Sequence, residues 1–421
     1  MRQNHLLADF GVELHKGKLD NGLKVIFIEK PFAPIYARML IRAGSTFDPS
    51  HLPGLAHFTE HILAAGSKSC FKEDFWGIME SVGGFRNAST SSTWMDVKCE
   101  IAEVAHMQKM KQHFTHALCT INATESAIEK EKGTIISEIH RRYSKLEEFE
   151  RDFVNAFFAN GTAWYHNSIG TIESVSRTQA SDVETFFTTH CCVENMVLVI
   201  AGGCTWNHVQ KTFSSIPFLN GSEQVLPEDP AFLQTPQQIH FEQNTSETRL
   251  RFAFKGPQCD SSDNYLLRFA MAMAHDGLTS LFYRRIRNEK NLAYALNMFN
   301  CNFVTNGYFG TYVGVPCDKV GKTIAAIKDC YEELLTEGIN ETEILSKNET
   351  SWFTAKRTME TSFQWVQELS RHALYPEHQT SFGDYPAIFN YLETFTSEQI
   401  NDVLKKYIDL ENMIFISCGK E

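Results

Sequence analysis

The sequence contains two similar short segments about half a chain apart. ENMVLVIAGG at 194–203 and ENMIFISCGK at 411–420 are separated by 217 residues in a chain of 421. Each copy follows a segment with helical periodicity, SDVETFFTTHC in the first half and SEQINDVLKKY in the second. Because 421 residues are too many for one compact core, the repeat predicts a tandem duplication.

Each half mixes strand-like and helix-like segments. Short β-rich runs such as LKVIFIEK and ARMLIRAG alternate with long helical patterns such as KVGKTIAAIKDCYEELLTEG. This pattern predicts an α+β fold in which helices cover one face of a sheet. A stretch with three prolines and no apolar period, 218–236, is typical of a surface linker. We therefore expect domains at 1–217 and 237–421, joined by this linker.

A possible metal site begins with the run His57-Phe58-Thr59-Glu60-His61. In a helix, His57 and His61 lie one turn apart on one face, where two imidazoles can bind one metal ion. A catalytic zinc requires three protein ligands and one open position. Glu138 is the candidate third ligand. The helical pattern of 124–145 places it on the same side as Glu131, so that one of the two can ligate while the other supports.

This arrangement predicts hydrolytic chemistry. Glu60 would act as general base on the zinc-bound water, so that hydroxide attacks a polarised peptide carbonyl. Manganese or cobalt could occupy the same ligands. At an offset of 217 from the two histidines the sequence has Ala274 and Leu278, so we expect one metal site per chain.

A second group of histidines offers an alternative metal site. His106, His113 and His116 also gather on one face of a predicted helix. No carboxylate at a suitable position completes the set, so we interpret them as three partly exposed helix histidines.

The text around the first motif resembles a known family. GLAHFTEHILAAGS, GGFRNASTSSTWMDVKCEI and EKGTIISEIH follow one another in the order and at the distances typical of the M16 (pitrilysin-like, inverzincin) metallopeptidases. The resemblance extends over nearly the whole chain. It implies Zn²⁺ held by His57, His61 and Glu138, with Glu60 as the catalytic base and Glu131 as a second acidic residue.

The resemblance also implies residues that bind substrate. The stretch from Gly83 to Thr90, which includes Asn87 and Ala88, is similar to the segment that leads into an exposed edge strand in the family. Substrate backbone pairs with such an edge, so binding does not depend on particular side chains. In RRIRNEKNLAYAL, Arg287 and Tyr294 match an arginine and a tyrosine that contact substrate from the C-terminal half.

The same resemblance implies the architecture and a partner. Two homologous α+β domains, each a mainly antiparallel sheet with helices on one face, would form half of a clam-like chamber. A lone half leaves the catalytic face open to water, so a second chain is expected to close it. The sequence favours a homodimer, with a heterodimer of M16-like subunits as the alternative. The predicted function is a zinc endopeptidase acting on peptides or a precursor's leader; the alternative is a non-catalytic, peptide-binding or scaffolding subunit.

Charge and hydropathy exclude some partners. The formal net charge of −12 and the pI of about 5.8 argue against nucleic acid or an anionic membrane as partner. No apolar run is long enough to span a bilayer. The first 16 residues lack the apolar core of a secretory signal, so the expected location is the cytoplasm.

Overall fold

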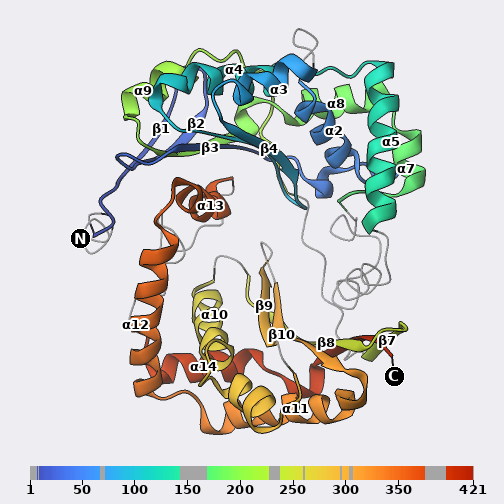
Figure 1. Ribbon diagram of the computed structural model, residues 1–421, viewed down its shortest axis with the longest axis vertical. Helices are drawn as coiled ribbons and strands as arrows, with labels where there is room; N and C mark the ends of the chain where they lie inside the picture. The colour runs from blue at the N-terminus through green and yellow to red at the C-terminus, as the bar shows by residue number, and fades with distance from the viewer. Residues whose placement is uncertain are drawn as a thin grey trace.

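The structure consists of two sheet units stacked along the longest axis of the molecule (Figure 1). It is a computed structural model, and it describes residues 7, 9–66, 72–142, 168–226, 238–258, 261–293, 296–302, 307–374 and 395–420. Strands of the first sheet lie between residues 13 and 202, and those of the second between 238 and 419.

The first sheet has six strands in the order β1-β2-β6-β3-β5-β4. Neighbouring strands are antiparallel except β2 and β6, which are parallel. Strand β4 pairs only with β5 and is an edge. The strands are β1 (Glu13–Lys18), β2 (Lys24–Glu29), β3 (Ile35–Ile41), β4 (Phe85–Thr90), β5 (Met95–Ile101) and β6 (Met196–Gly202).

Helices of the N-terminal half pack on one face of this sheet and form a large apolar core with it. The core includes Phe27 and Met39 from the strands and Phe58 and Phe114 from the helices, all fully buried. The helices are α2 (Leu55–Ala64), α3 (Lys72–Glu80), α4 (Met107–Leu118), α5 (Glu125–Arg142), α7 (Ile172–Arg177), α8 (Ala180–His190) and α9 (Trp206–Phe213).

The second sheet has five strands in the order β7-β11-β8-β10-β9. Its strands are β7 (Gln238–Glu242), β8 (Glu247–Gly256), β9 (Leu296–Asn302), β10 (Gly307–Pro316) and β11 (Ile414–Gly419). The helices of this half are α10 (Ser262–His275), α11 (Val320–Glu337), α12 (Glu341–Thr358), α13 (Ser362–Ala373) and α14 (Ser397–Tyr407), with a π-helical turn η5 (Tyr283–Glu289). None of the helices in the described ranges combines the length and hydropathy that crossing a bilayer requires.

The two sheets repeat one topology. Without β1, the first order β2-β6-β3-β5-β4 matches the second, β7-β11-β8-β10-β9, strand for strand, and β7 and β11 form the one parallel pair, as β2 and β6 do. Strands β6 and β11 lie within the two similar segments, 194–203 and 411–420. The α+β fold and the tandem duplication are therefore confirmed. The linker boundaries stay predictions, because 227–237 lie outside the described residues.

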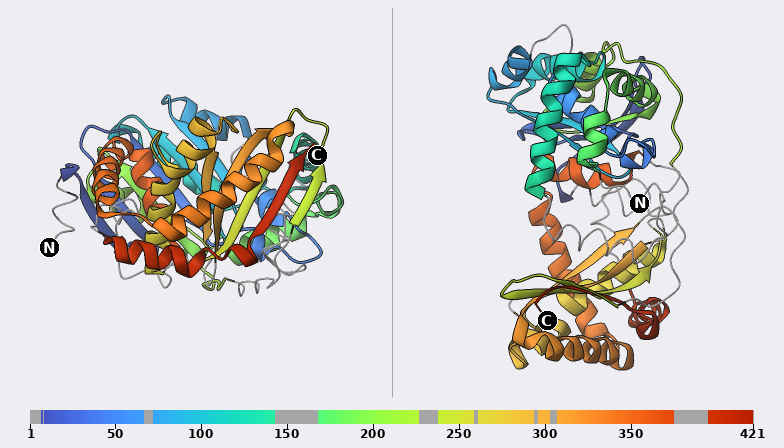
Figure 2. Two further views of the ribbon diagram at one scale, coloured as in Figure 1. Left: turned by 90° about the horizontal axis from the view of Figure 1, so that it is seen from below. Right: turned by 90° about the vertical axis from the view of Figure 1, so that its right-hand side faces the viewer.

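One helix of the C-terminal half crosses to the first sheet. Helix α13 lies against the face of the first sheet opposite its other helices, beside strands β2, β3 and β6 (Figures 1 and 2). Trp365, Val366 and Leu369 of α13 form an apolar cluster with Tyr36 and Val199 of the strands. Strands β3 and β6 are buried along their whole length because both faces are covered.

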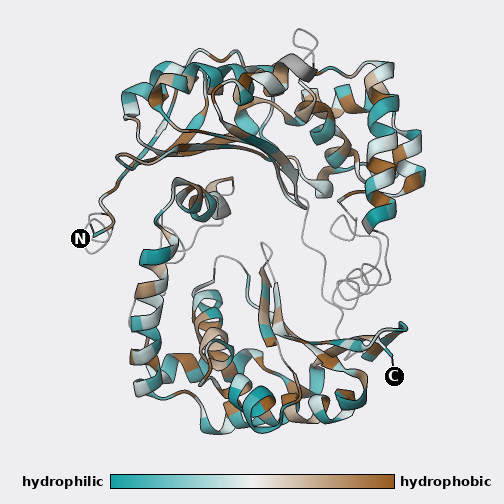
Figure 3. Cartoon of the chain, in the orientation of Figure 1, coloured by the Kyte–Doolittle hydropathy of each residue, from teal (hydrophilic) through white to brown (hydrophobic). Residues whose placement is uncertain are grey.

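Hydropathy along the chain follows this arrangement. The central strands of both sheets are among the most hydrophobic stretches, and the helices show hydrophilic residues on their outer sides (Figure 3). An apolar stripe facing a sheet and a polar face toward water are what amphipathic helices of a layered fold require.

Candidate metal centre

Helix α2 is anchored at its start by a carboxylate from the preceding loop. The Asp48 side chain accepts hydrogen bonds from the backbone N–H groups of Gly54 and Ala56, at 2.6 and 2.7 Å. Gly54, just before the helix, has φ 92°, a conformation that favours glycine. Burial raises the pKa of Asp48 to about 7, although both hydrogen bonds favour its ionised form. The Asp48 carboxylate thus provides hydrogen-bond acceptors for the first backbone N–H groups of α2 and fixes the position at which the helix begins.

Two histidines of α2 and one glutamate of α5 converge. His57 Nε2 and His61 Nε2 lie 3.7 and 3.6 Å from Glu138 Oε2, and the two imidazole centroids are 4.6 Å apart. One potential ligand atom from each residue lies within 4.8 Å of the other two. The structure thus brings together the three residues predicted as ligands; that they bind a metal stays a prediction.

The donor set fits a divalent metal that accepts nitrogen and oxygen. Zinc–ligand bonds of about 2.0–2.1 Å in a tetrahedron separate neighbouring ligand atoms by about 3.4 Å, close to the 3.6 and 3.7 Å seen between histidine and glutamate. Glu131, 5% exposed, places Oε2 3.2 Å from His61 Nδ1. This contact orients the His61 ring and leaves its Nε2 facing Glu138, as outer carboxylates do at metal-binding histidines.

Glu60 lies on α2 next to His61 and is only 8% exposed. Burial raises the pKa of Glu60 to about 7, against the opposing effects of His61 and of a hydrogen bond from Thr90. In that bond, Thr90 Oγ1 donates to Glu60 Oε2 at 3.2 Å. A carboxylate that titrates near neutral pH and is held in one orientation suits proton transfer.

The edge strand β4 ends beside this group. Thr90 is its last residue, and helix α2 packs against the strand. Asn87 is exposed, and its Oδ1 accepts a hydrogen bond from the backbone N–H of Ala88 at 2.9 Å. Both predicted backbone-binding residues therefore lie on the open edge of the sheet that carries the candidate metal centre.

The second pair of predicted substrate-binding residues lies elsewhere. Arg287 is in η5, which packs against α11 in the second unit, and its guanidinium lies 4.8 Å from the centre of the Tyr283 ring. The structure does not bring Arg287 to the metal centre within one chain. Tyr294 lies outside the described residues.

The alternative histidine group does not form a metal site in the described part of the chain. His57, His61 and Glu138 are the one group of three potential ligands found there. His113 is 2% exposed and stacks on Phe75 with ring centroids 5.0 Å apart. Burial lowers its pKa to about 3, so His113 is a neutral core residue. The prediction of partly exposed histidines is thus confirmed for His106 and His116, which are half-buried, and is wrong for His113, which the core encloses.

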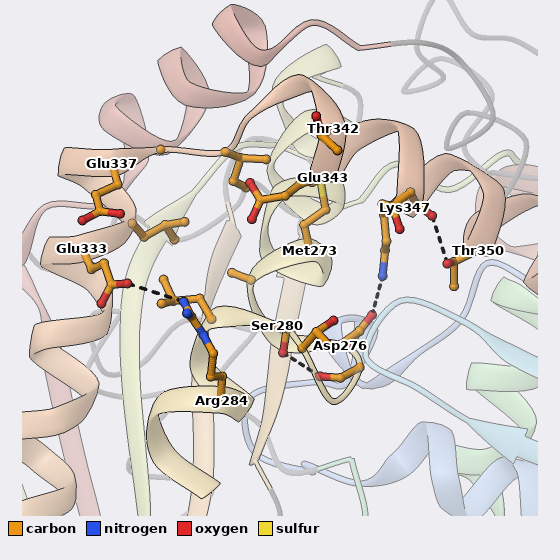
Figure 4. A pocket seen from close by; sticks show the side chains of 18 residues that line it. Met273, Asp276, Ser280, Arg284, Glu333, Glu337, Thr342, Glu343, Lys347 and Thr350 are labelled. Atoms are coloured by element: carbon orange, nitrogen blue, oxygen red, sulfur yellow. Dashed lines mark hydrogen bonds and ion pairs between the residues drawn. The ribbon is translucent and has the colours of Figure 1, made fainter. Parts of the chain in front are cut away.

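A pocket of about 450 Å³ lies in the second unit, between α10, α11 and α12 (Figure 4). Its two basic residues are both beside carboxylates: Lys347 binds Asp276 at 3.2 Å, and Arg284 lies 3.7 Å from Glu333. Its described lining contains neither histidine nor cysteine. The described lining of this pocket therefore lacks the imidazole ligands of the His57–His61–Glu138 group.

Two residues that support the site were not predicted from the sequence. Thr90 closes the GGFRNAST text, so its position next to the edge strand was visible, but its contact with Glu60 depends on how α2 packs. Asp48 stands nine residues before His57, with no local pattern that indicates a helix cap. Only the path of the loop brings its carboxylate to the start of α2.

Comparison with known proteins identifies the family. Residues 24–169 match the family described as insulinase (peptidase family M16), and residues 178–347 match the peptidase M16 inactive domain. The chain is 21% identical over 402 residues to the uncharacterized zinc protease YmxG of Bacillus subtilis (strain 168), covering 92% of this chain and 93% of the relative. It is 23% identical over 337 residues to the mitochondrial-processing peptidase subunit beta of Mus musculus, covering 77% of this chain and 68% of that protein.

Solved structures show the same fold. A protease from Helicobacter pylori superposes with a TM-score of 0.85 at 17% identity, over 97% of this chain and 99% of that one. The two matched regions, 24–169 and 178–347, follow one another along the chain as a tandem duplication predicts. His57, His61 and Glu138 lie within the region 24–169. This chain therefore belongs to the M16 peptidase family.

Proposed function

We propose that this protein is a zinc-dependent endopeptidase that hydrolyses peptides or removes a leader from a precursor. The observation that carries the proposal is the convergence of His57, His61 and Glu138, with buried Glu60 on the same helix as the two histidines. The printed name of the Bacillus subtilis relative, a zinc protease, supports zinc as the metal.

Each residue of the site has a distinct task in peptide hydrolysis. Bound zinc supplies an acidified water molecule and polarises a carbonyl. Glu60 accepts the proton of the attacking water and delivers it to the leaving amine. Thr90 holds the Glu60 carboxylate in one orientation, and Glu131 does the same for the His61 ring. These contacts place the proton acceptor before substrate arrives, which reduces reorganisation during the reaction.

Substrate binds as an added strand on β4. An open sheet edge forms main-chain hydrogen bonds with an extended peptide whatever its sequence. In the free protein, Asn87 Oδ1 accepts the hydrogen bond from the Ala88 N–H. A substrate carbonyl takes the place of the Asn87 side chain, so the backbone of Ala88 becomes a contact for the peptide.

A second chain completes the chamber. Arg287 lies in the second unit, away from α2 and α5. We propose that two copies face each other, so that the Arg287 and Tyr294 region of each serves the other's metal centre. A heterodimer with an M16-like partner is the alternative, and it is supported by the relative named as a subunit of the mitochondrial-processing peptidase. Size-exclusion chromatography with light scattering tests this: a dimer is expected, and an active monomer contradicts it.

The activity test uses quenched fluorescent peptides with wild-type protein and Glu60→Gln. The substitution keeps the size of the side chain but removes the proton acceptor, so kcat should fall on the order of 10²–10⁴-fold with metal content unchanged. A chelator should abolish turnover, and added Zn²⁺ should restore it. Glu129→Gln, at a glutamate of α5 that is 67% exposed, is the matched control and should leave turnover unchanged. Turnover that survives Glu60→Gln or complete metal removal contradicts the proposal.

The same assay decides the second candidate function. The match of residues 178–347 to a domain described as inactive favours a non-catalytic subunit that binds peptides without cleaving them. In that case peptides bind, but no cleavage occurs even with zinc present. Metal analysis of protein purified without added metal separates zinc from manganese or cobalt.

A further inference from the structure

We propose that Arg86 binds a carboxylate of the peptide substrate and gives the enzyme a preference for an acidic residue at one position near the cleaved bond. This inference rests on the proposed peptidase function and adds a substrate class to it. Arg86 lies on edge strand β4, two residues before Ala88 and four before Thr90. It is therefore on the strand to which the substrate is proposed to pair.

The strand register shows that the Arg86 side chain lies on the α2 side of the sheet. Residues paired across two strands point to the same face. Arg86, Ala88 and Thr90 of β4 are paired with Cys99, Val97 and Met95 of β5. These three β5 residues are buried in the same core as helix α2. Substrate side chains that point to this face of the sheet therefore meet Arg86.

Arg86 and Thr90 reach opposite ends of the same stretch of α2. Thr90 contacts Glu60, whereas Arg86 Nη1 donates to the backbone carbonyl of Ala64, the last residue of α2, at 3.4 Å. Glu60 and Ala64 are one turn apart on α2, and the two residues that contact them, Thr90 and Arg86, are four positions apart on β4. The guanidinium is close enough to the reaction to meet a residue near the cleaved bond.

Two aromatic rings hold the guanidinium. Its central carbon lies 4.9 Å from the centre of the Trp76 ring and 5.4 Å from that of Phe75. Trp76 Nε1 donates to the same Ala64 carbonyl, at 3.2 Å. Stacking on aromatic faces restricts a planar guanidinium, so it loses less freedom when it binds a ligand.

No described carboxylate lies within ion-pair distance of Arg86; burial lowers the pKa of its guanidinium, and the more distant Glu80 acts in the opposite direction. The guanidinium contacts the Ala64 carbonyl and the two rings. Two other arginines are paired: Arg38 of β3 with Asp96, and Arg42, just after β3, with Glu223. A guanidinium has five N–H donors, so Arg86 can form further hydrogen bonds. A carboxylate is the partner that matches both its charge and its planar geometry.

An added strand brings substrate side chains within reach of Arg86. A residue directly across a strand pair has its Cβ atom about 5 Å away, and diagonal neighbours lie about 7–8 Å away. Both distances are within the length of an arginine side chain. The carboxylate can come from an aspartate or glutamate side chain or from the C-terminus of a short peptide, and the experiment separates these sources.

The test starts from a parent peptide that the wild-type enzyme cleaves. Each position near the cleaved bond is changed in turn to Glu, Gln and Lys, and every peptide is made with a free and with an amidated C-terminus. We expect kcat/KM for Glu to exceed that for Gln on the order of tenfold at one position, in both series. If peptides with a free C-terminus are instead cleaved faster than their amidated forms, whether the varied residue is Glu or Gln, Arg86 binds the terminal carboxylate and the preference for an acidic residue is wrong.

Variants then connect the preference to Arg86. Arg86→Gln should make the Glu and Gln peptides equal, and Arg86→Glu should favour Lys at the same position. Lys98→Gln is the control: this cation on neighbouring β5 is already paired with Asp96 at 3.2 Å, so its loss should leave the preference unchanged. If Arg86 only supports α2, its substitution lowers turnover of all peptides by one factor and leaves their ratios intact. That result overturns the inference.

A binding experiment keeps this inference separate from the proposed function. If the wild-type protein cleaves no peptide, the proposed function fails, and fluorescence anisotropy with the Glu and Gln peptides then tests Arg86. Binding of the Glu peptide on the order of tenfold tighter in wild type, and equal binding of both in Arg86→Gln, supports the inference. Equal affinities in wild type, or no binding at all, overturn it.

Discussion

The two sheet units have one topology, but the helix that follows the corresponding strand carries different residues in each. In the first unit, α2 follows β3 and presents His57, Glu60 and His61. In the second, α10 follows β8, the counterpart of β3, and buries mainly apolar residues of its sequence YLLRFAMAMA. Its His275 is enclosed in the core, 2.9 Å from Met271 O and 2.7 Å from Thr311 Oγ1. The corresponding helices thus differ in role: α2 carries the candidate metal ligands, and α10 contributes mainly to the apolar core.

The difference also shows what a buried polar site requires. Taking Glu60 and Glu131 out of water costs free energy unless each is hydrogen-bonded. Thr90 provides such a contact for Glu60, and His61 provides one for Glu131. In the second unit, His275 of α10 stacks on Phe282, with the two ring centroids 4.0 Å apart. At this helix the first unit therefore pairs polar side chains with one another, whereas the second encloses one hydrogen-bonded histidine beside an aromatic ring.

The largest effect is expected from removing a candidate metal ligand in the first unit. His57→Ala leaves two ligands, so the protein should purify with little zinc and lose activity by at least about 10³-fold. His275→Gln, the matched change in the second unit, should retain one metal ion per chain. Metal analysis and peptide turnover measure both. Full zinc content in His57→Ala would show that the metal binds elsewhere.

A large loss of stability is expected where the two units meet. Trp365 of α13 is fully buried against the first sheet, and its Nε1 donates to Met359 O at 2.8 Å. Trp365→Ala should lower the free energy of unfolding by about 3–5 kcal/mol because it leaves a cavity. Phe353→Ala on α12, at a ring that is 64% exposed, should change it by less than about 0.5 kcal/mol. Urea denaturation measures both, and similar losses would contradict this role of α13.

A moderate effect is expected from the supporting carboxylate. Glu131→Gln weakens the contact that orients His61, so zinc affinity should fall about 10–100-fold. Competition with a fluorescent chelator measures this change. Glu129→Gln on the exposed side of the same helix should leave affinity unchanged. Equal affinities in wild type and Glu131→Gln would remove Glu131 from the site.

The smallest effect concerns pH. Burial lowers the pKa of His275 from 6.5 to about 4. The unfolded chain therefore binds a proton at His275 between pH 6.5 and 4, where the folded chain does not. The stability that His275 contributes is complete above pH 6.5 and should fall by up to about 1.4 kcal/mol per pH unit between pH 6.5 and 4. His113 and His190 act in the same direction. The raised pKa values of Asp48 and Glu60 act in the opposite direction, so the contribution of His275 is measured as the difference between wild type and variant. His275→Gln should flatten the dependence of unfolding free energy on pH, and an unchanged slope would contradict this account.

Much of the fold was visible in the sequence because it depends on local patterns. Alternation of strand-like and helical segments predicted α+β units, and repeated text predicted two copies. Strand β6 is apolar on both faces, which is typical of a strand covered on both sides. The sequence did not indicate that the second cover is α13, whose residues lie more than 150 positions away.

Local periodicity by itself determined that His57 and His61 share a helix face with Glu60 and that Glu131 and Glu138 share another, because these relations follow from helical geometry within one segment. Tertiary structure alone decided that the two faces meet, that Asp48 and Thr90 support α2, and that Arg86 stacks on Trp76 beside it. Those contacts join residues far apart in the chain, and their distances depend on how the core packs the helices against the sheet.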